Sequence, residues 1–160
     1  MTGLFWAVTA AALALDVGSK LWAVHSLGQR VTVLPGVLEL RLSRNDGMAL
    51  GLLSGNWLAN LLLPLMVIAA GWLLLRRYRP TAFTRIAAGL IVGGFLGNFG
   101  ERLFFGSVVD MLYFPWLPWF ICNGADIAIC FGVAMLVIST LFRPQDWREL
   151  GEDHSAAGGK

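Results

Sequence analysis

Two aspartates, Asp110 and Asp126, stand where the third predicted membrane span ends and the fourth begins. A carboxylate beside lipid is costly and is therefore normally kept for a function. Two carboxylates at the same membrane depth indicate acid–base chemistry on a peptide bond. The spacing alone leaves a second interpretation open, in which both are unrelated interfacial carboxylates.

The geometry of the chain allows these two side chains to form a pair. Only residues 111–125 separate them, so this segment need only reverse direction to bring both carboxylates to one level. Two neighbouring carboxyl groups cannot both ionise cheaply, so one keeps a proton. The ionised partner can activate water while the protonated one assists the carbonyl, as in an aspartic protease. We therefore take Asp110 and Asp126 as the candidate catalytic pair.

The elements that must position this pair are membrane helices. Of the 160 residues, 57% are hydrophobic and 14% charged, and the charges lie between long apolar runs. This profile is typical of a polytopic membrane protein. Four segments approach the roughly 20 apolar residues that span a bilayer: 3–24, 56–75, 85–105 and 121–142. We expect a single membrane domain over 1–142 and a flexible cytoplasmic tail over 143–160. The first span is interpreted as a retained helix, because no Lys or Arg precedes it as in a signal peptide.

The distribution of arginine predicts the orientation. Arg76, Arg77, Arg79 and Arg85 lie between the second and third spans, whereas 106–120 contains no Lys or Arg. The positive-inside rule therefore places both termini in the cytoplasm and the aspartates on the outer side. Three arginines between the first two spans weaken this difference without reversing it: Arg30, Arg41 and Arg44.

A small β element is predicted on the outer side, over about 31–54. Residues 38–44 alternate strictly between apolar and polar side chains, after Pro35-Gly36 and before a second turn at residues 45–47. Period-two alternation bracketed by turns indicates strands. The predicted fold class is therefore all-α and membrane-embedded, with a β-hairpin that lies on the membrane face of the bundle. The aromatic segment 111–120 is interpreted as an interfacial anchor, or alternatively as a substrate contact.

Polar groups inside the first span form a second constellation. Asp16 and Lys20 are one helical turn apart, so they can form an ion pair that lowers the cost of burying either group. The pair either only holds the helix against its neighbours or supports a site. Ser19 and Lys20 point about 100° apart on a helix, which disfavours a Ser/Lys protease.

The third span becomes polar towards its outer end, where Asn98, Glu101 and Arg102 lie. Polar groups at that depth line a wet cavity more often than they face lipid. Gly93, Gly94 and Gly97 thin one face of the same span and permit close helix packing.

Other chemistries have little support in the sequence. The two histidines, His25 and His154, fall on opposite sides of the predicted membrane, which argues against a zinc site or a serine triad. Cys122 and Cys130 lie too far apart on one predicted helix for a disulfide. We expect no metal, no cofactor and no nucleic-acid partner.

Four motifs resemble, in order along about residues 10–140, those of the lipoprotein signal peptidase family, also called signal peptidase II. They are Asp16-x-x-x-Lys20; Arg44-Asn45-x-Gly47-x-Ala49-x-Gly51; Gly97-Asn98-x-x-Glu101-Arg102 with Gly106-x-Val108-Val109-Asp110; and Asn123-x-Ala125-Asp126. One such motif alone is a weak signal, but four in order across four spans are specific.

The resemblance implies an inner-membrane aspartic endopeptidase with four transmembrane helices and an outer β-cradle. Its substrates would be prolipoproteins, cut just before a cysteine that carries diacylglycerol, and membrane lipids would surround a working monomer. Asp110 and Asp126 would be catalytic. The remaining motif residues would bind substrate or support the site: Asp16, Lys20, Asn45, Gly47, Asn98, Arg102 and Asn123.

Three residues depart from the family pattern: Glu101 where Asp is usual, Cys122 where an aromatic residue is common, and Met48 where a small residue is usual. They leave open a paralogue of the same fold that binds or assembles in the membrane without cutting. A proton-coupled carrier is disfavoured, because the second span has no polar residue between Asn60 and Arg76.

Overall fold

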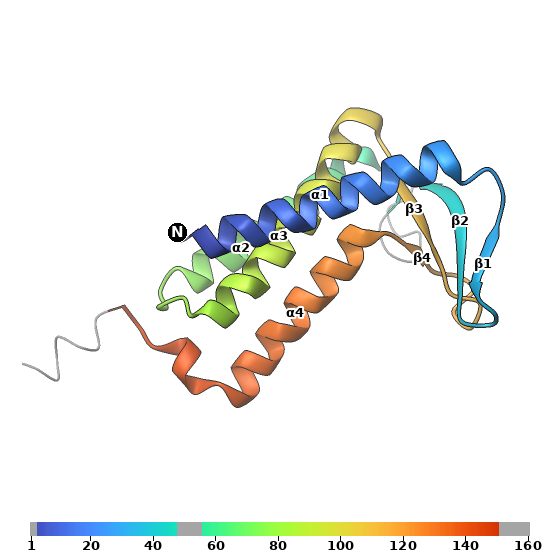
Figure 1. Ribbon diagram of the computed structural model, residues 1–160. Coiled ribbons are helices and arrows are strands. Elements are labelled where there is room, and N and C mark those ends of the chain that lie inside the picture. The colour runs from blue at the N-terminus through green and yellow to red at the C-terminus, as the bar shows by residue number, and fades with distance from the viewer. Residues whose placement is uncertain (1–2, 48–55, 151–160) are drawn as a thin grey trace, which may run out of the picture.

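The computed structural model describes residues 3–47 and 56–150. Four helices in it are long and apolar enough to cross a membrane. They are α1 (Gly3–Ser26), α2 (Trp57–Leu75), α3 (Ala82–Phe105) and α4 (Gly124–Phe142). A small sheet lies at one end of the helices, and the N-terminus lies at the other end (Figure 1). The predicted fold class, four membrane helices with a small β element, is confirmed.

Local capping explains where α3 and α4 begin. Thr81 and Thr84 form a capping box, so α3 begins at Ala82, earlier than the predicted residue 85. Asn123 caps α4, which therefore begins at Gly124 and not at the predicted residue 121. α3 ends at Gly106, whose φ of 72° is the left-handed conformation that favours glycine.

α3 is the central helix and packs against α1, α2 and α4. Its glycines permit this packing, because side chains there would collide with both neighbours. A Cβ on Gly93 would lie 2.7 Å from the Thr9 carbonyl oxygen on α1, and one on Gly94 would lie 2.5 Å from the Ala125 carbonyl oxygen on α4. These close approaches bring α1, α3 and α4 together beneath the sheet.

The sheet is antiparallel and has the order β1-β2-β3-β4. β1 (Val31–Leu34) and β2 (Leu38–Asn45) form the predicted hairpin. β3 (Val108–Tyr113) and β4 (Ile121–Cys122) come from the connection between α3 and α4, so the cradle is built from two separate segments of the chain. The sequence predicts a β element between the first two helices only, and residues 48–54 of that predicted range lie outside the described residues.

The register between β2 and β3 is what carries Asp110 to its place. Asn45 pairs with Val108, and Ser43 pairs with Asp110. Because alternate residues share a face of a strand, Asn45 and Ser43 lie on the same face of β2. Asp110 is therefore held by a strand whose neighbour supplies a polar partner.

The segment after α4 is folded up to residue 150, although a flexible tail was predicted from residue 143. Pro144–Trp147 forms a 3₁₀ turn (η2) in which Asp146 is buried and accepts hydrogen bonds from Ser139 and Arg143. The amide of Leu150 donates to the Arg77 carbonyl oxygen. A polar segment is ordered here because its buried carboxylate finds donors on α4 and its backbone pairs with the α2–α3 connection.

Candidate active site

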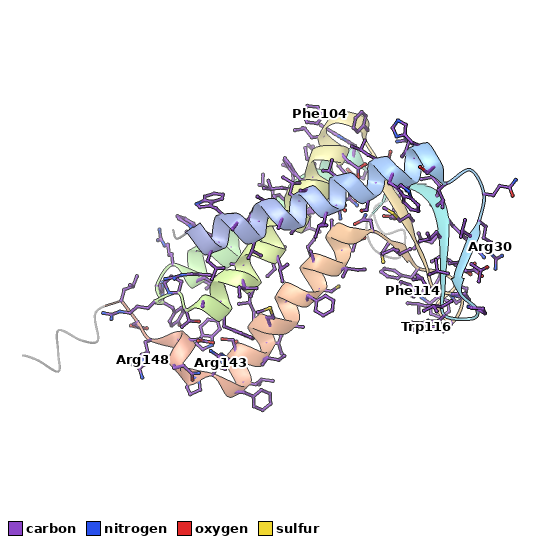
Figure 2. All side chains as sticks on the ribbon, in the orientation of Figure 1. Arg30, Phe104, Phe114, Trp116, Arg143 and Arg148 are labelled. Carbon is purple, nitrogen blue, oxygen red and sulfur yellow. The ribbon has the colours of Figure 1, made fainter. Side chains whose placement is uncertain are left out.

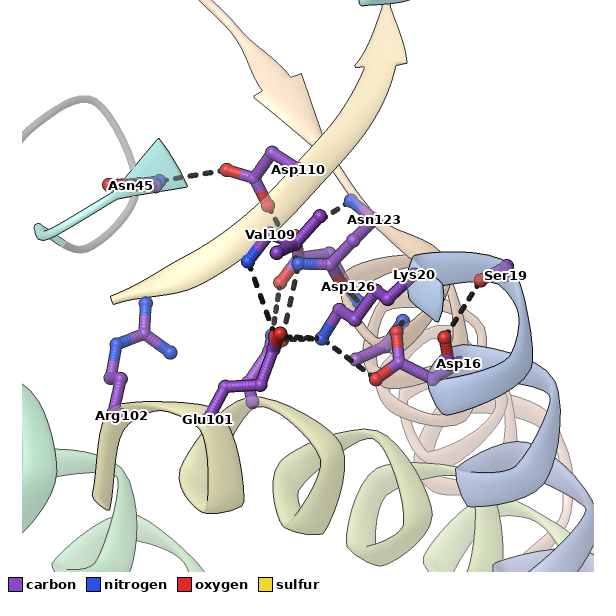
Figure 3. A network of polar contacts seen from close by, with 12 residues as sticks. Asp16, Ser19, Lys20, Asn45, Glu101, Arg102, Val109, Asp110, Asn123 and Asp126 are labelled. Carbon is purple, nitrogen blue, oxygen red and sulfur yellow. Dashed lines mark hydrogen bonds and ion pairs between the residues drawn. The ribbon is translucent and has the colours of Figure 1, made fainter. Parts of the chain in front are cut away.

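The polar residues singled out in the sequence meet where the helix bundle joins the sheet. Figure 3 shows side chains from α1, α3, α4, β2 and β3 converging there. The two candidate catalytic residues come from different kinds of element, since Asp110 lies on β3 and Asp126 lies in the first turn of α4.

Asp110 is a buried carboxylate held from two sides, with only 3% of its surface exposed. Its Oδ2 accepts a hydrogen bond of 3.0 Å from Asn45 Nδ2, and its Oδ1 accepts one of 2.7 Å from Asn123 Nδ2. Burial raises the pKa of Asp110 to about 6, and repulsion from Asp126 adds to this effect. The hydrogen bonds from Asn45 and Asn123 lower the same pKa.

Asp126 is fixed by the start of α4. Its Oδ2 accepts from the Asn123 backbone amide at 3.2 Å, and its own amide donates to Asn123 Oδ1 at 3.0 Å, so the two residues form a capping box. Its Oδ1 accepts from Asn98 Nδ2 at 2.9 Å. The helix that begins here therefore fixes the orientation of this carboxylate.

Two asparagines link the carboxylates to each other. Asn123 Nδ2 donates both to Asp110 Oδ1 and to Asn98 Oδ1, at 2.7 and 3.1 Å. Asn98 in turn donates to Asp126. The two aspartates are thus joined by a continuous hydrogen-bond chain through fully or almost fully buried side chains.

The predicted ion pair in α1 is confirmed and extends further than expected. Lys20 Nζ lies 2.8 Å from Asp16 Oδ2, from Glu101 Oε2 and from Asn98 Oδ1. Lys20 and Asp16 are both buried, with exposures of 4% and 1%. Ser19 Oγ donates to the Asp16 carbonyl oxygen of its own helix, which gives it no place in a Ser/Lys dyad.

Arg102 belongs to a different part of the site. Its Nη2 donates to the Gly47 carbonyl oxygen at 2.9 Å, and the Gly47 amide donates to Asn45 Oδ1 at 3.0 Å. In Figure 3 the Arg102 side chain stands apart from the chain of contacts around Lys20. Arg102 and Gly47 therefore connect α3 to the end of β2. Met48, Ala49 and Gly51 of the same predicted motif lie outside the described residues.

Two cavities adjoin each other at Asp126. The larger has a volume of about 500 Å³ and includes both aspartates in its lining. The smaller, of about 230 Å³, lies between α2, α3 and α4 and has an apolar lining that includes Pro64, Phe95 and Phe99. Four residues line both cavities: Asn98, Arg102, Asp126 and Ile129.

The aromatic residues of the segment between β3 and β4 lie in two different places. Trp119 and Phe120 line the larger cavity. Phe114 and Trp116 lie at the far end of the sheet, away from the helices (Figure 2), and 63% of Trp116 is exposed. Both interpretations of this segment, an interfacial anchor and a substrate contact, stay predictions.

Cys122 sits next to this site without chemistry of its own. Burial, together with the charges of the nearby aspartates, raises the pKa of its thiol to about 12. A thiol in this state is not a nucleophile. Its side chain is buried and packs within the protein.

Sequence reasoning missed two contributors to the site. Glu101 was noted among the polar residues of the third span and as a departure from a family pattern, but it was given no role in the site, yet it contacts both Lys20 and the amide of Val109. Its spacing of three from Asn98 could have indicated a shared helix face. Asn60, the single amide in an apolar span, lines the smaller cavity and donates to the Asp46 carbonyl oxygen at 2.8 Å.

The fold and the site together define a multi-pass membrane protein in which a buried carboxylate, Asp110, and a half-buried one, Asp126, share a cavity at one end of the helix bundle. The sequence profile of the family described as Signal peptidase (SPase) II matches residues 8–142. The chain therefore belongs to the signal peptidase II family, a family of proteases.

Individual relatives cover most of the chain. Proteins named lipoprotein signal peptidase from Gloeobacter violaceus and Neisseria gonorrhoeae are both 37% identical to it, over 86% and 89% of this chain and 81% and 92% of their own lengths. One from Klebsiella aerogenes is 38% identical over 91% of this chain and 93% of its own. A solved bacterial membrane enzyme has a TM-score of 0.75 at 24% identity and covers 94% of each chain, which shows a shared fold.

Proposed function

We propose that this protein is an intramembrane aspartic endopeptidase that removes signal peptides from prolipoproteins, with Asp110 and Asp126 as the catalytic pair. The scissile bond would be the one just before a diacylglyceryl-modified cysteine. The observation that carries the proposal is the pair of carboxylates, which line one cavity and are joined by Asn98 and Asn123.

The surroundings of the two carboxylates support different roles. The raised pKa of Asp110, caused mainly by burial, favours its protonated form, which can donate to a carbonyl oxygen. Asp126 lies in the first turn of α4, where the helix dipole favours negative charge. Asp110 therefore acts as the general acid and Asp126 as the general base, while the titration belongs to the pair.

The reaction is a hydrolysis that returns the pair to its starting state. Asp126 takes a proton from water, the water oxygen attacks the peptide carbonyl carbon, and Asp110 gives its proton to the carbonyl oxygen. The tetrahedral intermediate then breaks its C–N bond as a proton passes from Asp126 to the amine nitrogen. Asp110 recovers a proton when the carboxyl product forms.

The remaining residues of the larger cavity are suited to hold the peptide. Arg102 and Asn45 lie beside the carboxylates and are tied to each other through Gly47. Their polar groups can position the substrate backbone and the oxygens of the tetrahedral intermediate. The adjoining apolar cavity offers room for an apolar part of a substrate that arrives from the lipid.

The protein would work in the bacterial inner membrane with its site facing outward and both termini in the cytoplasm. Arg76, Arg77, Arg79 and Arg85 support this orientation through the positive-inside rule. A site at the outer end of the bundle would meet substrates whose mature part has already crossed the membrane. The family resemblance favours a monomer as the working form.

A gel-shift assay tests the function directly. Purified wild-type protein in detergent is incubated with a diacylglyceryl-modified prolipoprotein, beside Asp110→Asn and Asp126→Asn. We expect cleavage by the wild type and a loss of at least about 100-fold in either variant, because each removes one proton-transfer group. Cleavage near the wild-type rate in either variant would contradict the assigned pair.

Asp146→Asn is the matched control, since it makes the same substitution at a buried aspartate at the opposite end of the molecule. Its folded fraction should cleave normally. If the folded wild type does not cleave this substrate, the result favours a paralogue that binds without cutting.

A further inference from the structure

Lys20 has no donor left for a substrate. Its ammonium group carries three N–H donors and no acceptor, and the structure gives it three acceptors at 2.8 Å: Asp16 Oδ2, Glu101 Oε2 and Asn98 Oδ1. The side chain is also 4% exposed and does not line either cavity. A buried cation with every donor used acts on its neighbours and not on a ligand.

The first neighbour on which it acts is Asn98. Because an ammonium can only donate, the atom of Asn98 that faces Lys20 must be the amide oxygen. The amide nitrogen is then forced to face Asp126 Oδ1, at 2.9 Å. The same Asn98 oxygen accepts from Asn123 Nδ2, which also donates to Asp110. One cation thus fixes the direction of the hydrogen bonds that end on both carboxylates.

The two acidic partners of Lys20 act on the backbone beside the catalytic pair. Glu101 Oε2 accepts from the amide of Val109 at 3.2 Å, and Val109 directly precedes Asp110. Asp16 Oδ1 accepts from the amide of Ala125 at 2.8 Å, and Ala125 directly precedes Asp126. Each acidic group therefore anchors the residue before one of the two aspartates, and Lys20 joins the two anchors (Figure 3).

We propose that Asp16, Lys20 and Glu101, here called the Lys20 cluster, are positioning residues that hold the catalytic pair in register and fix the polarity of its hydrogen bonds. They do not contact the substrate. The inference rests on the proposed function. It also explains how Glu101 can stand where the family usually has Asp, because its longer side chain reaches both Lys20 and the β3 backbone.

Lys20→Met tests this role, since methionine keeps a long unbranched side chain and removes all three donors. We expect kcat to fall about 10–100-fold, the effect typical of residues that orient a catalytic group. KM should stay within about twofold of the wild type, because no substrate contact is lost. If Lys20 bound the substrate, Lys20→Met would instead raise KM and leave kcat largely unchanged.

The pH profile separates positioning from loss of folded protein. Charged groups near Asp110 come from α1 (Lys20), α3 (Glu101 and Arg102) and α4 (Asp126). The charge of Lys20 lowers the pKa of Asp110, so Lys20→Met should move the alkaline limb of the kcat/KM profile to higher pH. A smaller amount of folded enzyme would lower the apparent kcat/KM by the same factor at every pH, without moving this limb.

A second pair of variants keeps the proposal testable if Lys20→Met does not fold. Glu101→Met removes the acceptor for Lys20 and Val109, whereas Glu101→Gln retains an acceptor oxygen at the same position. We expect Glu101→Met to lower kcat about tenfold or more and Glu101→Gln to restore a large part of that loss. Equal activity of both variants would overturn the proposal.

Ser19→Ala is the control, because Ser19 lies in the same helical turn and bonds only to the backbone of α1. It should match the wild type in kcat, in KM and in the pH at which the alkaline limb falls. Wild-type cleavage together with control-like behaviour of the Lys20 and Glu101 variants would overturn the positioning role alone. Failure of the folded wild type to cleave would overturn the proposed function and the positioning role with it.

Discussion

At the scale of single residues, Asp110 and Asp126 differ in the groups that donate hydrogen bonds to them. Among the described residues, Asp110 accepts hydrogen bonds from side-chain amides, whereas Asp126 also accepts one from a backbone amide at a helix start. Burial raises the pKa of Asp110 to about 6, while Asn45 opposes that rise through a hydrogen bond to the ionised form. The hydrogen bond from Asn45 therefore helps to determine whether Asp110 is protonated.

The proposed roles predict how activity depends on pH. Above about 6, Asp110 loses its proton and the pair becomes doubly ionised, so kcat/KM of the wild type should fall as pH rises. Asn45→Ala removes a hydrogen bond that favours the ionised form, which raises the pKa of Asp110 further. The alkaline limb should move to higher pH, and the maximal rate should fall about tenfold for the loss of one hydrogen bond to a charged group.

A pH series of the cleavage assay measures both effects. Asn56→Ala is the matched control, since Asn56 caps α2 and bonds to no residue of the acidic pair. Its pH limb should coincide with that of the wild type. A limb that stays fixed or moves to lower pH in Asn45→Ala would contradict the assignment of the acid role to Asp110.

At the scale of elements, α3 sets the distances within the site. It supplies Asn98, Glu101 and Arg102 from its C-terminal turns, and its glycines determine how closely α1 and α4 approach. Gly94 contacts the Ala125 carbonyl oxygen, one residue before Asp126, and a Cβ on Gly97 would overlap Asp16. The packing of this helix therefore also determines the geometry of the proposed catalytic pair.

Gly94→Ala should separate α3 from α4. Its added Cβ would lie 2.5 Å from a backbone oxygen that has little freedom to move. We expect a loss of stability of about 1–3 kcal/mol, as for other overpacked cores, together with a fall in kcat. Thermal unfolding in detergent and the cleavage assay measure the two effects.

Gly100→Ala provides the matched control on the same helix, because a Cβ at Gly100 meets no atom within 4 Å. It should change stability by less than about 0.5 kcal/mol and leave cleavage intact. Equal behaviour of the two variants would show that the α3–α4 spacing does not control the site.

At the scale of the whole molecule, charge differs between the two ends of the bundle. The end that carries the α2–α3 connection also carries η2, so Arg77 and Arg79 lie beside Arg148 there. At the sheet end, Arg30 and Arg41 both pair with the buried Glu39, and the hydrogen bond from Arg30 lowers the pKa of Glu39. This pairing reduces the positive charge of the hairpin and supports the proposed orientation.

Cysteine labelling tests the orientation in the full chain. In a background with Cys122→Ala and Cys130→Ala, single cysteines are introduced as Thr32→Cys on β1 and Ala82→Cys at the start of α3, both at exposed positions. A membrane-impermeant maleimide applied to spheroplasts should label the first and not the second. The reverse pattern would place the site in the cytoplasm and contradict the proposed topology.

The sequence by itself determined the four spans, the hairpin and the polar residues of the site. Hydropathy over about 20 residues and alternation over 38–44 are local properties, which neighbours in sequence fix without a tertiary partner. Asp110, Asp126 and Lys20 were identifiable because a charge in an apolar segment is costly wherever it finally lies. Asp16 and Lys20 could be paired because one helical turn separates them.

Only the tertiary structure decided how these groups are joined. β3 lacks the alternation of apolar and polar residues that predicts a strand, and β4 has only two residues. β3 becomes a strand because β2 offers a partner from a distant part of the chain, and β4 then pairs with β3. Residue 143 onward was predicted to be flexible from its polar composition, but Asp146 finds donors on α4. Lys20 bonds to Asn98, and Asp16 bonds to Ala125. These partners are far apart in the sequence, and no local pattern predicts that they meet. Hydrogen bonds require atoms within about 3 Å, and such distances are set by how helices pack.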